Sequence, residues 1–193
     1  MGGRSTIHTL RQLARHLPQG LQRKATGGAV RHLPIRISFD VDDTLACQPH
    51  HADEEESRLP AILHRWLGEP LRIGTRTLTR ELRRQGCSIW VYTSSGRTPS
   101  YIRRWLLLYG IQVDGIVNSE RHSEALNLHG FANSPSKFPP AFGIDLHVDD
   151  SEGVKLEGHE HGFRVVVVRP DDENWAQRVI DAVAEYRNAS LAS

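Results

Sequence analysis

Residues 35–44 read Ile-Arg-Ile-Ser-Phe-Asp-Val-Asp-Asp-Thr, an alternation of apolar and polar side chains that runs into a group of aspartates. Apolar side chains at every second position up to Phe39 predict a β-strand. One face of this strand is apolar, and the other must meet polar or amphipathic groups. The polar residues from Asp40 onward predict a turn directly after the strand.

Strands and helices alternate along the rest of the chain. Apolar runs predict strands at residues 88–92, 115–117, 144–148 and 163–168. Helical patterns predict helices at residues 74–86 and 98–110 and a last helix near the end of the sequence. We expect Asp171 or Asp172 to cap this last helix. Residues 118–140 carry only a weak pattern. The alternation predicts an α/β fold, a three-layer sandwich with a mainly parallel central sheet.

The composition is that of a globular protein of one domain. The 193 residues are 38% hydrophobic and 24% charged. No apolar run approaches the roughly 20 residues that a membrane-spanning helix needs, so we expect no membrane span. Cys47 and Cys87 are the only cysteines, too few for a disulfide framework. Because no apolar signal segment opens the sequence, they predict reduced thiols in a cytoplasmic protein.

The net charge of +1 hides an uneven distribution. Residues 1–39 carry seven Lys or Arg residues and no acidic residue, whereas residues 40–193 carry 17 basic and 23 acidic residues. We expect a basic N-terminal arm with an amphipathic helix at residues 1–32, a core at residues 33–193 and a small flap at about residues 46–70. The arm has four open interpretations: packing on the core, an organelle transit peptide, a lipid anchor, or a contact with nucleic acid, for which it lacks interleaved aromatic residues.

Polar residues follow three of the predicted strands at the point where each ends. They are Asp40 and Asp42, Thr93 and Ser94, and Asp149 and Asp150. In an open parallel sheet the ligand binds beyond the carboxyl ends of the strands, so these residues predict the site. Several carboxylates at one edge repel one another unless a hard cation neutralises them, which favours Mg²⁺. Hydroxyls and free backbone N–H groups beside that cation would bind a phosphate.

The order of these residues resembles the motifs of the haloacid dehalogenase-like (HAD) phosphatases. The run Asp40-Val41-Asp42-Asp43-Thr44 after an apolar strand is similar to the first motif, Thr93 to the second, a lone lysine to the third, and Asp149-Asp150 to the fourth. The resemblance covers roughly residues 35–170. It implies a Rossmann-like core and a Mg²⁺-dependent hydrolase that acts on phosphorylated substrates.

The resemblance also implies a role for each matching residue. Asp40 would be the nucleophile that forms an aspartyl-phosphate, and Asp42 the general acid and then the general base. Asp40, the main-chain carbonyl of Asp42 and Asp149 would hold Mg²⁺, with Asp150 acting through a bound water. Thr93 and the N–H of Ser94 would bind phosphoryl oxygens, and Thr44 would brace the turn.

The third-motif lysine can only be Lys137, because no other lysine lies between the second and fourth motifs. It would offset the repulsion between the nucleophile and the phosphate. The family usually places a helix between this lysine and the next strand, whereas the sequence Phe138-Pro139-Pro140 leaves room for little more than a turn. Arg97 is therefore a second candidate for this cationic role, as a substrate-binding residue.

The distance between the first two motifs limits the size of any cap domain. Only 52 residues separate Asp40 from Thr93, and a strand and a helix use many of them. An open site would admit a bulky substrate, a phosphorylated macromolecule as well as a small molecule. Two alternatives are a catalytically silent binding protein of the same fold and a receiver-type domain phosphorylated on aspartate. The receiver needs its acceptor at the end of the third strand, where this chain has Asn118.

Overall fold

A computed structural model describes residues 34–46, 53–56, 69–131 and 134–192. The predicted N-terminal arm at residues 1–32 lies outside the described residues, as does most of the predicted flap at residues 46–70. Within the part that is described, no helix is long and apolar enough to cross a membrane.

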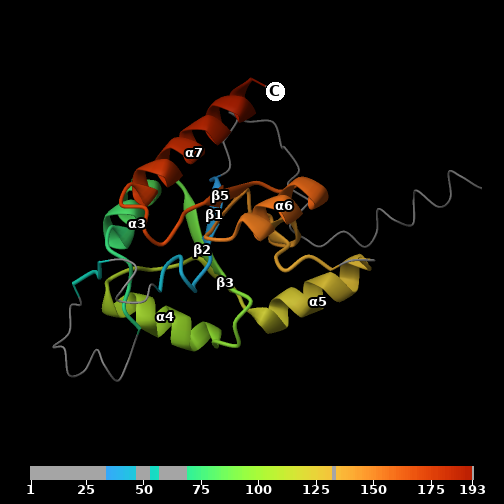
Figure 1. Cartoon of the computed structure of the whole chain (residues 1–193), viewed down its shortest axis with the longest axis horizontal. Helices are drawn as coiled ribbons and strands as arrows, with labels where there is room; N and C mark the ends of the chain where they lie inside the picture. The colour runs from blue at the N-terminus through green and yellow to red at the C-terminus, as the bar shows by residue number, and fades with distance from the viewer. Residues whose placement is uncertain (1–33, 47–52, 57–68, 132–133, 193) are drawn as a thin grey trace, which may run out of the picture.

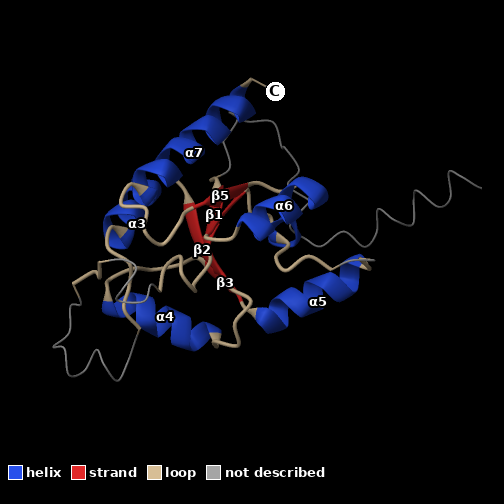
Figure 2. Ribbon diagram, in the orientation of Figure 1, coloured by secondary structure: helices blue, strands red, loops and turns tan. Residues whose placement is uncertain are grey.

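A sheet of five strands forms the centre of the described chain (Figures 1 and 2). Its strands are β1 (Arg36–Phe39), β2 (Ser88–Tyr92), β3 (Gly115–Val117), β4 (Leu146–Asp149) and β5 (Val165–Val167). They lie in the order β3-β2-β1-β4-β5, and every neighbouring pair is parallel. The predicted parallel sheet is therefore confirmed, with β1 in the middle.

Helices cover both faces of the sheet. The helical elements are α3 (Thr75–Arg84), α4 (Pro99–Leu108), α5 (Ser119–His129), the short 3₁₀ helix η2 (Pro139–Phe142), α6 (Glu152–His161) and α7 (Trp175–Leu191). Figure 1 shows α3, α4 and α7 on one side of the sheet and α5 and α6 on the other. This arrangement is the three-layer sandwich that the sequence predicts.

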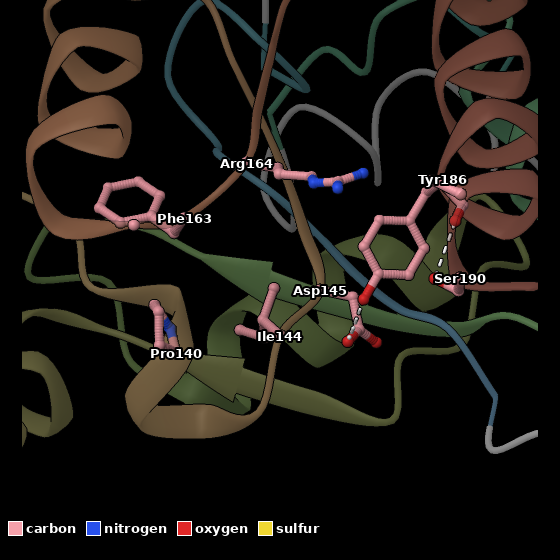
Figure 3. A pocket seen from close by; sticks show the side chains of 9 residues that line it. Pro140, Ile144, Asp145, Phe163, Arg164, Tyr186 and Ser190 are labelled. Atoms are coloured by element: carbon pink, nitrogen blue, oxygen red, sulfur yellow. Dashed lines mark hydrogen bonds between the residues drawn. The ribbon is translucent and has the colours of Figure 1, made fainter. Parts of the chain in front are cut away.

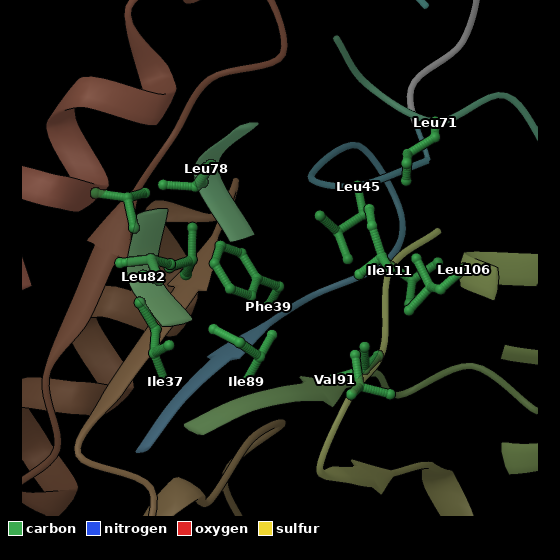
Figure 4. Packing of buried hydrophobic residues seen from close by; sticks show 14 of the residues in the cluster. Ile37, Phe39, Leu45, Leu71, Leu78, Leu82, Ile89, Val91, Leu106 and Ile111 are labelled. Carbon is green, nitrogen blue, oxygen red and sulfur yellow. The ribbon is translucent and has the colours of Figure 1, made fainter. Parts of the chain in front are cut away.

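The two faces of the sheet differ in polarity because side chains alternate along each strand. Ile37 and Phe39 of β1 point into the main apolar core with Ile89 and Val91 of β2, where Leu78 of α3 packs against them (Figure 4). The opposite face carries polar and amphipathic residues, namely Ser38, Trp90, Tyr92 and His147. The sequence of β1 predicts this division, and the polar face is the one that α5 and α6 cover.

Two helices and one cap differ from the sequence-based expectations. The weakly patterned residues 118–140 contain α5, and α6 follows β4 without having been predicted. Neither Asp171 nor Asp172 caps α7, whose N-cap is Asn174. The carboxylate of Asp172 instead accepts the backbone N–H of Asn174 and a hydrogen bond from Arg178, so it braces the turn that leads into the helix.

Candidate active site

The strand order of the sheet reverses between β1 and β4. After β1 the chain forms β2 and β3 on one side of this strand, and it then forms β4 and β5 on the other side. Ligands of open α/β sheets bind beyond the carboxyl ends of the strands at such a point. Asp40 directly follows β1, with its N–H bonded to the carbonyl of Val148 at 2.8 Å, and Asp149 is the last residue of β4.

A buried lysine links these two aspartates. Lys137 is only 3% exposed, and its ammonium group forms an ion pair with Asp40 Oδ1. The same Nζ lies 3.7 Å from Asp149 Oδ2 and donates to the carbonyl oxygen of Tyr92 at 3.3 Å. The structure therefore brings together three of the residues that the sequence singled out, from positions 40, 137 and 149.

Burial and charge act in opposite directions on the two aspartates. Burial raises the pKa of Asp40, as does the nearby Asp149, and the attraction of Lys137 offsets only part of this increase. Burial also acts to raise the pKa of Asp149, but hydrogen bonds from His147 and Ser151, together with the charge of Lys137, more than compensate, so its pKa lies below the ordinary value. The pKa values of the two carboxyl groups are therefore shifted in opposite directions.

Asp149 is oriented by a chain of buried hydrogen bonds that the sequence did not reveal. His147 Nε2 lies 3.0 Å from Asp149 Oδ2, and His147 Nδ1 lies 2.8 Å from the hydroxyl of Ser38. Ser38 and His147 are paired across β1 and β4 and are fully buried. The other carboxylate oxygen of Asp149 accepts the N–H of Ser151 at 2.9 Å. Contacts to both oxygens fix the carboxylate in one orientation.

The turn after β1 is tight and turns one aspartate outward. The N–H groups of Leu45 and Ala46 both bond to the carbonyl of Val41, at 3.0 and 2.7 Å. Asp43 has φ of 55°, in the left-handed region that Asp tolerates better than most residues. Thr44 is fully buried, and its expected role in bracing the turn stays a prediction.

Asp42 lies on the exposed side of this turn and binds Arg97. The guanidinium of Arg97 donates to both oxygens of Asp42, at 2.9 and 2.8 Å, and to both oxygens of Glu69, at 2.8 and 2.7 Å. Tyr101 also donates to Glu69, at 2.8 Å. Hydrogen bonds from Arg97 lower the pKa of Glu69 despite its partial burial. Arg97 therefore engages Asp42 and Glu69, not Asp40, so the structure gives Lys137 the place next to the first aspartate.

Thr93 and Ser94 lie at the carboxyl end of β2, beside β1. Thr93 is fully buried, and its Oγ1 accepts the backbone N–H of Ser95 at 3.1 Å. Its own N–H bonds to the carbonyl of Val117, which fixes the turn to the end of β3. Ser94 is exposed. A hydroxyl and a turn of backbone thus lie at the same edge of the sheet as Asp40.

The expected metal ligands do not form a complete side-chain site in the part of the chain that the structure describes. Among the described residues, no three His, Cys, Asp or Glu side chains are arranged to hold a metal ion. Asp42 is paired with Arg97, and Asp40 is paired with Lys137. The donor chemistry still fits a hard cation, because burial and then the charges of Asp149 and Asp40 raise the pKa of Asp150. A bound divalent cation would relieve this mutual repulsion.

A hollow of about 430 Å³ lies at the other end of the sheet (Figure 3). It is lined by Asp145 and Arg164, which precede β4 and β5, and by Tyr186 of α7. The hydroxyl of Tyr186 donates to Asp145 at 3.0 Å, and the guanidinium of Arg164 lies 4.9 Å from the Tyr186 ring centre. Both oxygens of Asp145 are bonded, since the second accepts the N–H of Arg36. The candidate active site remains the opposite edge, where the aspartates gather.

Comparison with solved structures finds distant likenesses. The similar chains include one from a Pnkp1/Rnl/Hen1 RNA repair complex (16% identity, TM-score 0.44) and a protein described as a HAD-like family hydrolase from Porphyromonas gingivalis (14%, 0.42). They also include one described as a 3-deoxy-D-manno-octulosonate 8-phosphate phosphatase from Vibrio cholerae (14%, 0.39). The matches cover 76%, 78% and 81% of this chain and 46%, 98% and 86% of those chains. This chain thus spans less than half of the RNA repair protein's length. No protein-family model and no curated protein matches the sequence.

Proposed function

We propose that the chain is a Mg²⁺-dependent phosphomonoester hydrolase of the HAD type that works through an aspartyl-phosphate on Asp40. The observation that carries the proposal is the buried ion pair between Asp40 and Lys137 at the carboxyl ends of β1 and β4. An aspartate kept next to a desolvated ammonium group is poised to approach an anionic phosphate that it would otherwise repel. The motif order in the sequence supports the same reaction class.

In the proposed reaction, a carboxylate oxygen of Asp40 attacks phosphorus in line with the leaving oxygen. A bond forms between phosphorus and Asp40, and the bond between phosphorus and the substrate oxygen breaks. Asp42, two residues further on, gives the leaving oxygen its proton. Water then attacks the phosphorus of the aspartyl-phosphate while Asp42 takes a proton from this water. A bond forms between phosphorus and the water oxygen, the bond between phosphorus and Asp40 breaks, and inorganic phosphate leaves with the Asp40 carboxylate regenerated.

Asp42 must exchange partners to act in this way. Its carboxylate is bound by Arg97 and its side chain is 56% exposed, so only solvent-screened contacts hold it there. Rotation of an exposed side chain takes far less time than an enzymatic turnover. We propose that Asp42 leaves Arg97 when a substrate binds, and that Arg97 then faces the substrate.

Lys137, Thr93 and Ser94 would bind the transferred phosphoryl group. Lys137 faces Asp40 directly, so its charge lies where negative charge develops during attack. The Thr93 hydroxyl and the N–H of Ser94 would donate to phosphoryl oxygens from the neighbouring strand end. Asp40, Asp149 and the main-chain carbonyl of Asp42 would hold Mg²⁺, with Asp150 bound through water. When bound, the ion supplies charge neutralisation and orients the phosphate.

The proposal is tested by hydrolysis of p-nitrophenyl phosphate with and without Mg²⁺. We expect turnover that requires Mg²⁺ and is lost in Asp40→Asn, whereas the matched control Asp171→Asn, an exposed aspartate paired with Arg169, keeps full activity. Mass spectrometry after an acid quench should detect a phosphoryl group on Asp40 in the wild-type chain. Folded protein without turnover on a broad panel of phosphate monoesters would favour the catalytically silent binding protein.

The receiver-type alternative conflicts with the sheet. Receiver domains have the strand order 2-1-3-4-5, whereas the order here is β3-β2-β1-β4-β5. The residue after β3 is Asn118, whose side chain caps α5 by accepting the N–H of Arg121. An acceptor aspartate is therefore missing from the position where a receiver needs it.

A further inference from the structure

Lys137 reaches the site from a segment without regular helical support. It lies between α5 and the four-residue η2, and the residues around it, 134–138, are neither helix nor strand. Fixing a long lysine side chain costs considerable rotamer entropy. A loop backbone holds the start of the side chain less rigidly than a helix or strand does. Other contacts must therefore hold this segment in place.

The hydroxyl of Tyr92 holds the segment on one side of Lys137. The backbone N–H of Phe138 donates to Tyr92 Oη at 2.8 Å, directly after the lysine. Tyr92 is fully buried at the end of β2, and its ring also lies under the ammonium group of Lys137, 5.6 Å from ring centre to Nζ. The tyrosine thus contacts both the backbone and the charge that it positions.

His122 of α5 supports Tyr92 from the other side. Its Nδ1 lies 2.6 Å from Tyr92 Oη, and the centres of the two rings are 5.8 Å apart. Both residues are buried, so this contact fixes the hydroxyl that binds the Phe138 N–H. The chain of contacts therefore runs from α5 through His122 and Tyr92 to the backbone directly after Lys137.

A third contact secures the same segment from the neighbouring helix. The N–H and the hydroxyl of Ser136 both donate to Glu157 Oε2 of α6, at 2.9 and 2.7 Å. This contact is exposed, whereas Tyr92 and His122 are buried, so the buried pair constrains the segment more strongly.

We propose that Tyr92 and His122 are positioning residues that together clamp the backbone at Phe138 and thereby hold Lys137 against Asp40. The catalytic purpose of this placement rests on the proposed function, but the clamp itself does not. Both residues lie on elements fixed by the sheet, because β2 pairs with β3 and α5 begins directly after β3. They supply the rigid support that a helix after the lysine would otherwise give.

The test is the rate of reductive methylation of Lys137 in the whole folded chain, without metal or substrate. The sequence has only three lysines, and Lys155 serves as an internal reference because its side chain is 45% exposed, against 4% for Lys137. Mass spectrometry of peptides gives the ratio of the two labelling rates. We expect strong protection of Lys137 in the wild-type chain.

The variant Tyr92→Phe removes the hydroxyl that binds Phe138 and His122, and His122→Leu removes the bond between the histidine and Tyr92. We expect labelling of Lys137, relative to Lys155, to become at least roughly tenfold faster in each, because loss of a buried hydrogen bond shifts a local opening equilibrium by about that factor. Tyr186→Phe is the control, since it also loses a hydrogen-bonded tyrosine hydroxyl, at the other end of the sheet. It should label like the wild-type chain.

The inference is overturned if Lys137 is as reactive as Lys155 in the wild-type chain, or if Tyr92→Phe and His122→Leu leave its protection unchanged. Phenylalanine replaces Tyr92 with nearly the same shape, so at least this variant should fold, and its urea unfolding confirms that protection was lost locally. A chain without phosphatase activity would refute the proposed function yet leave the labelling result to decide on the clamp. In an active chain, kcat should fall in both clamp variants and not in Tyr186→Phe.

Discussion

Replacement of Lys137 by methionine tests the central feature of the site, a cation buried between two carboxylates. Methionine keeps most of the side-chain volume and removes the charge. Asp40 then loses its ion pair and faces Asp149, whose own contacts to His147 and Ser151 remain. The cost therefore falls mainly on Asp40, whose side chain is only 10% exposed.

Removal of one partner of a buried ion pair typically costs about 3–5 kcal/mol. The upper part of this range is expected only while Asp40 stays ionised, because the carboxyl group can take up a proton instead. The double variant Asp40→Asn, Lys137→Met has no unpaired charge at this position. We expect it to recover most of the lost free energy of unfolding, as a thermodynamic cycle would show.

The loss should depend on pH in a defined direction. Burial already raises the pKa of Asp40 above its ordinary value of 3.8, and without Lys137 it rises further. A carboxyl group with a raised pKa in the folded state favours folding below its unfolded pKa, and this contribution is lost as pH rises through the folded pKa. The loss of unfolding free energy caused by Lys137→Met should therefore be largest near pH 7 and shrink toward about pH 4.

Urea unfolding followed by tryptophan fluorescence measures this deficit at several pH values. The slope of free energy against urea should match that of the wild-type chain, which shows that the variant unfolds from a similarly compact state. A loss below about 1 kcal/mol at neutral pH, the range of exposed ion pairs, would refute a desolvated pair. A loss of the same size at every pH would refute the role given to Asp40.

Three further changes test other parts of the structure. Gly115→Ala places a methyl group 2.3 Å from the Trp90 ring, so we expect a loss of about 1–3 kcal/mol in urea unfolding, and an unchanged value would contradict the packing of β3 on β2. Ser151→Ala removes the N-cap of α6, which accepts the N–H groups of Gly153 and Val154, and should lower the unfolding free energy by about 1 kcal/mol. Arg97→Ala should cost about 1 kcal/mol or less because solvent screens the pair. Arg97 holds the pKa of Glu69 below its ordinary value of 4.5, so this loss should begin to shrink as pH falls below 4.5 and vanish once Glu69 is protonated in the folded chain. A loss that persists in strong acid would contradict the contact.

The sequence predicts the site residues at strand ends because a parallel sheet brings all its carboxyl ends to one edge. Asp40, Thr93 and Asp149 each directly follow or end a strand whose apolar character is evident. Their location at one edge of the sheet can therefore be predicted without knowing how the strands pair residue by residue. Lys137 could be selected because lysine is rare in this chain. Its roles and those of the aspartates stay predictions until activity is measured.

The contacts that orient these residues could not be predicted in the same way. Ser38 meets His147 because β1 and β4 pair in one particular register, and a single sequence does not specify that register. Tyr92 meets His122 only because α5 exists, and α5 was missed. Only two of its residues, His122 and Ala125, are buried, too few to produce an apolar periodicity.

Local cap signals would have found both missed helices. Asn118 and Ser151 accept backbone N–H groups at the starts of α5 and α6, and Gly130 and Gly162 end these helices in the left-handed conformation. These four residues are typical helix boundaries in any sequence. Helix-cap residues, considered together with the spacing of apolar residues, predict the two helices that cover the polar face of the sheet.

Lys137 follows Asp40 by 97 positions, so the two partners of the buried ion pair are made at different times during protein synthesis. At about 5–20 residues per second, a ribosome needs roughly 5–20 s to add the lysine after the aspartate. Throughout this interval the nascent aspartate lacks this lysine as a counter-ion, and β4, which must lie beside β1, has not been made. A chain that stops before Lys137 therefore holds the first motif without the ion pair and without the strand that carries Asp149.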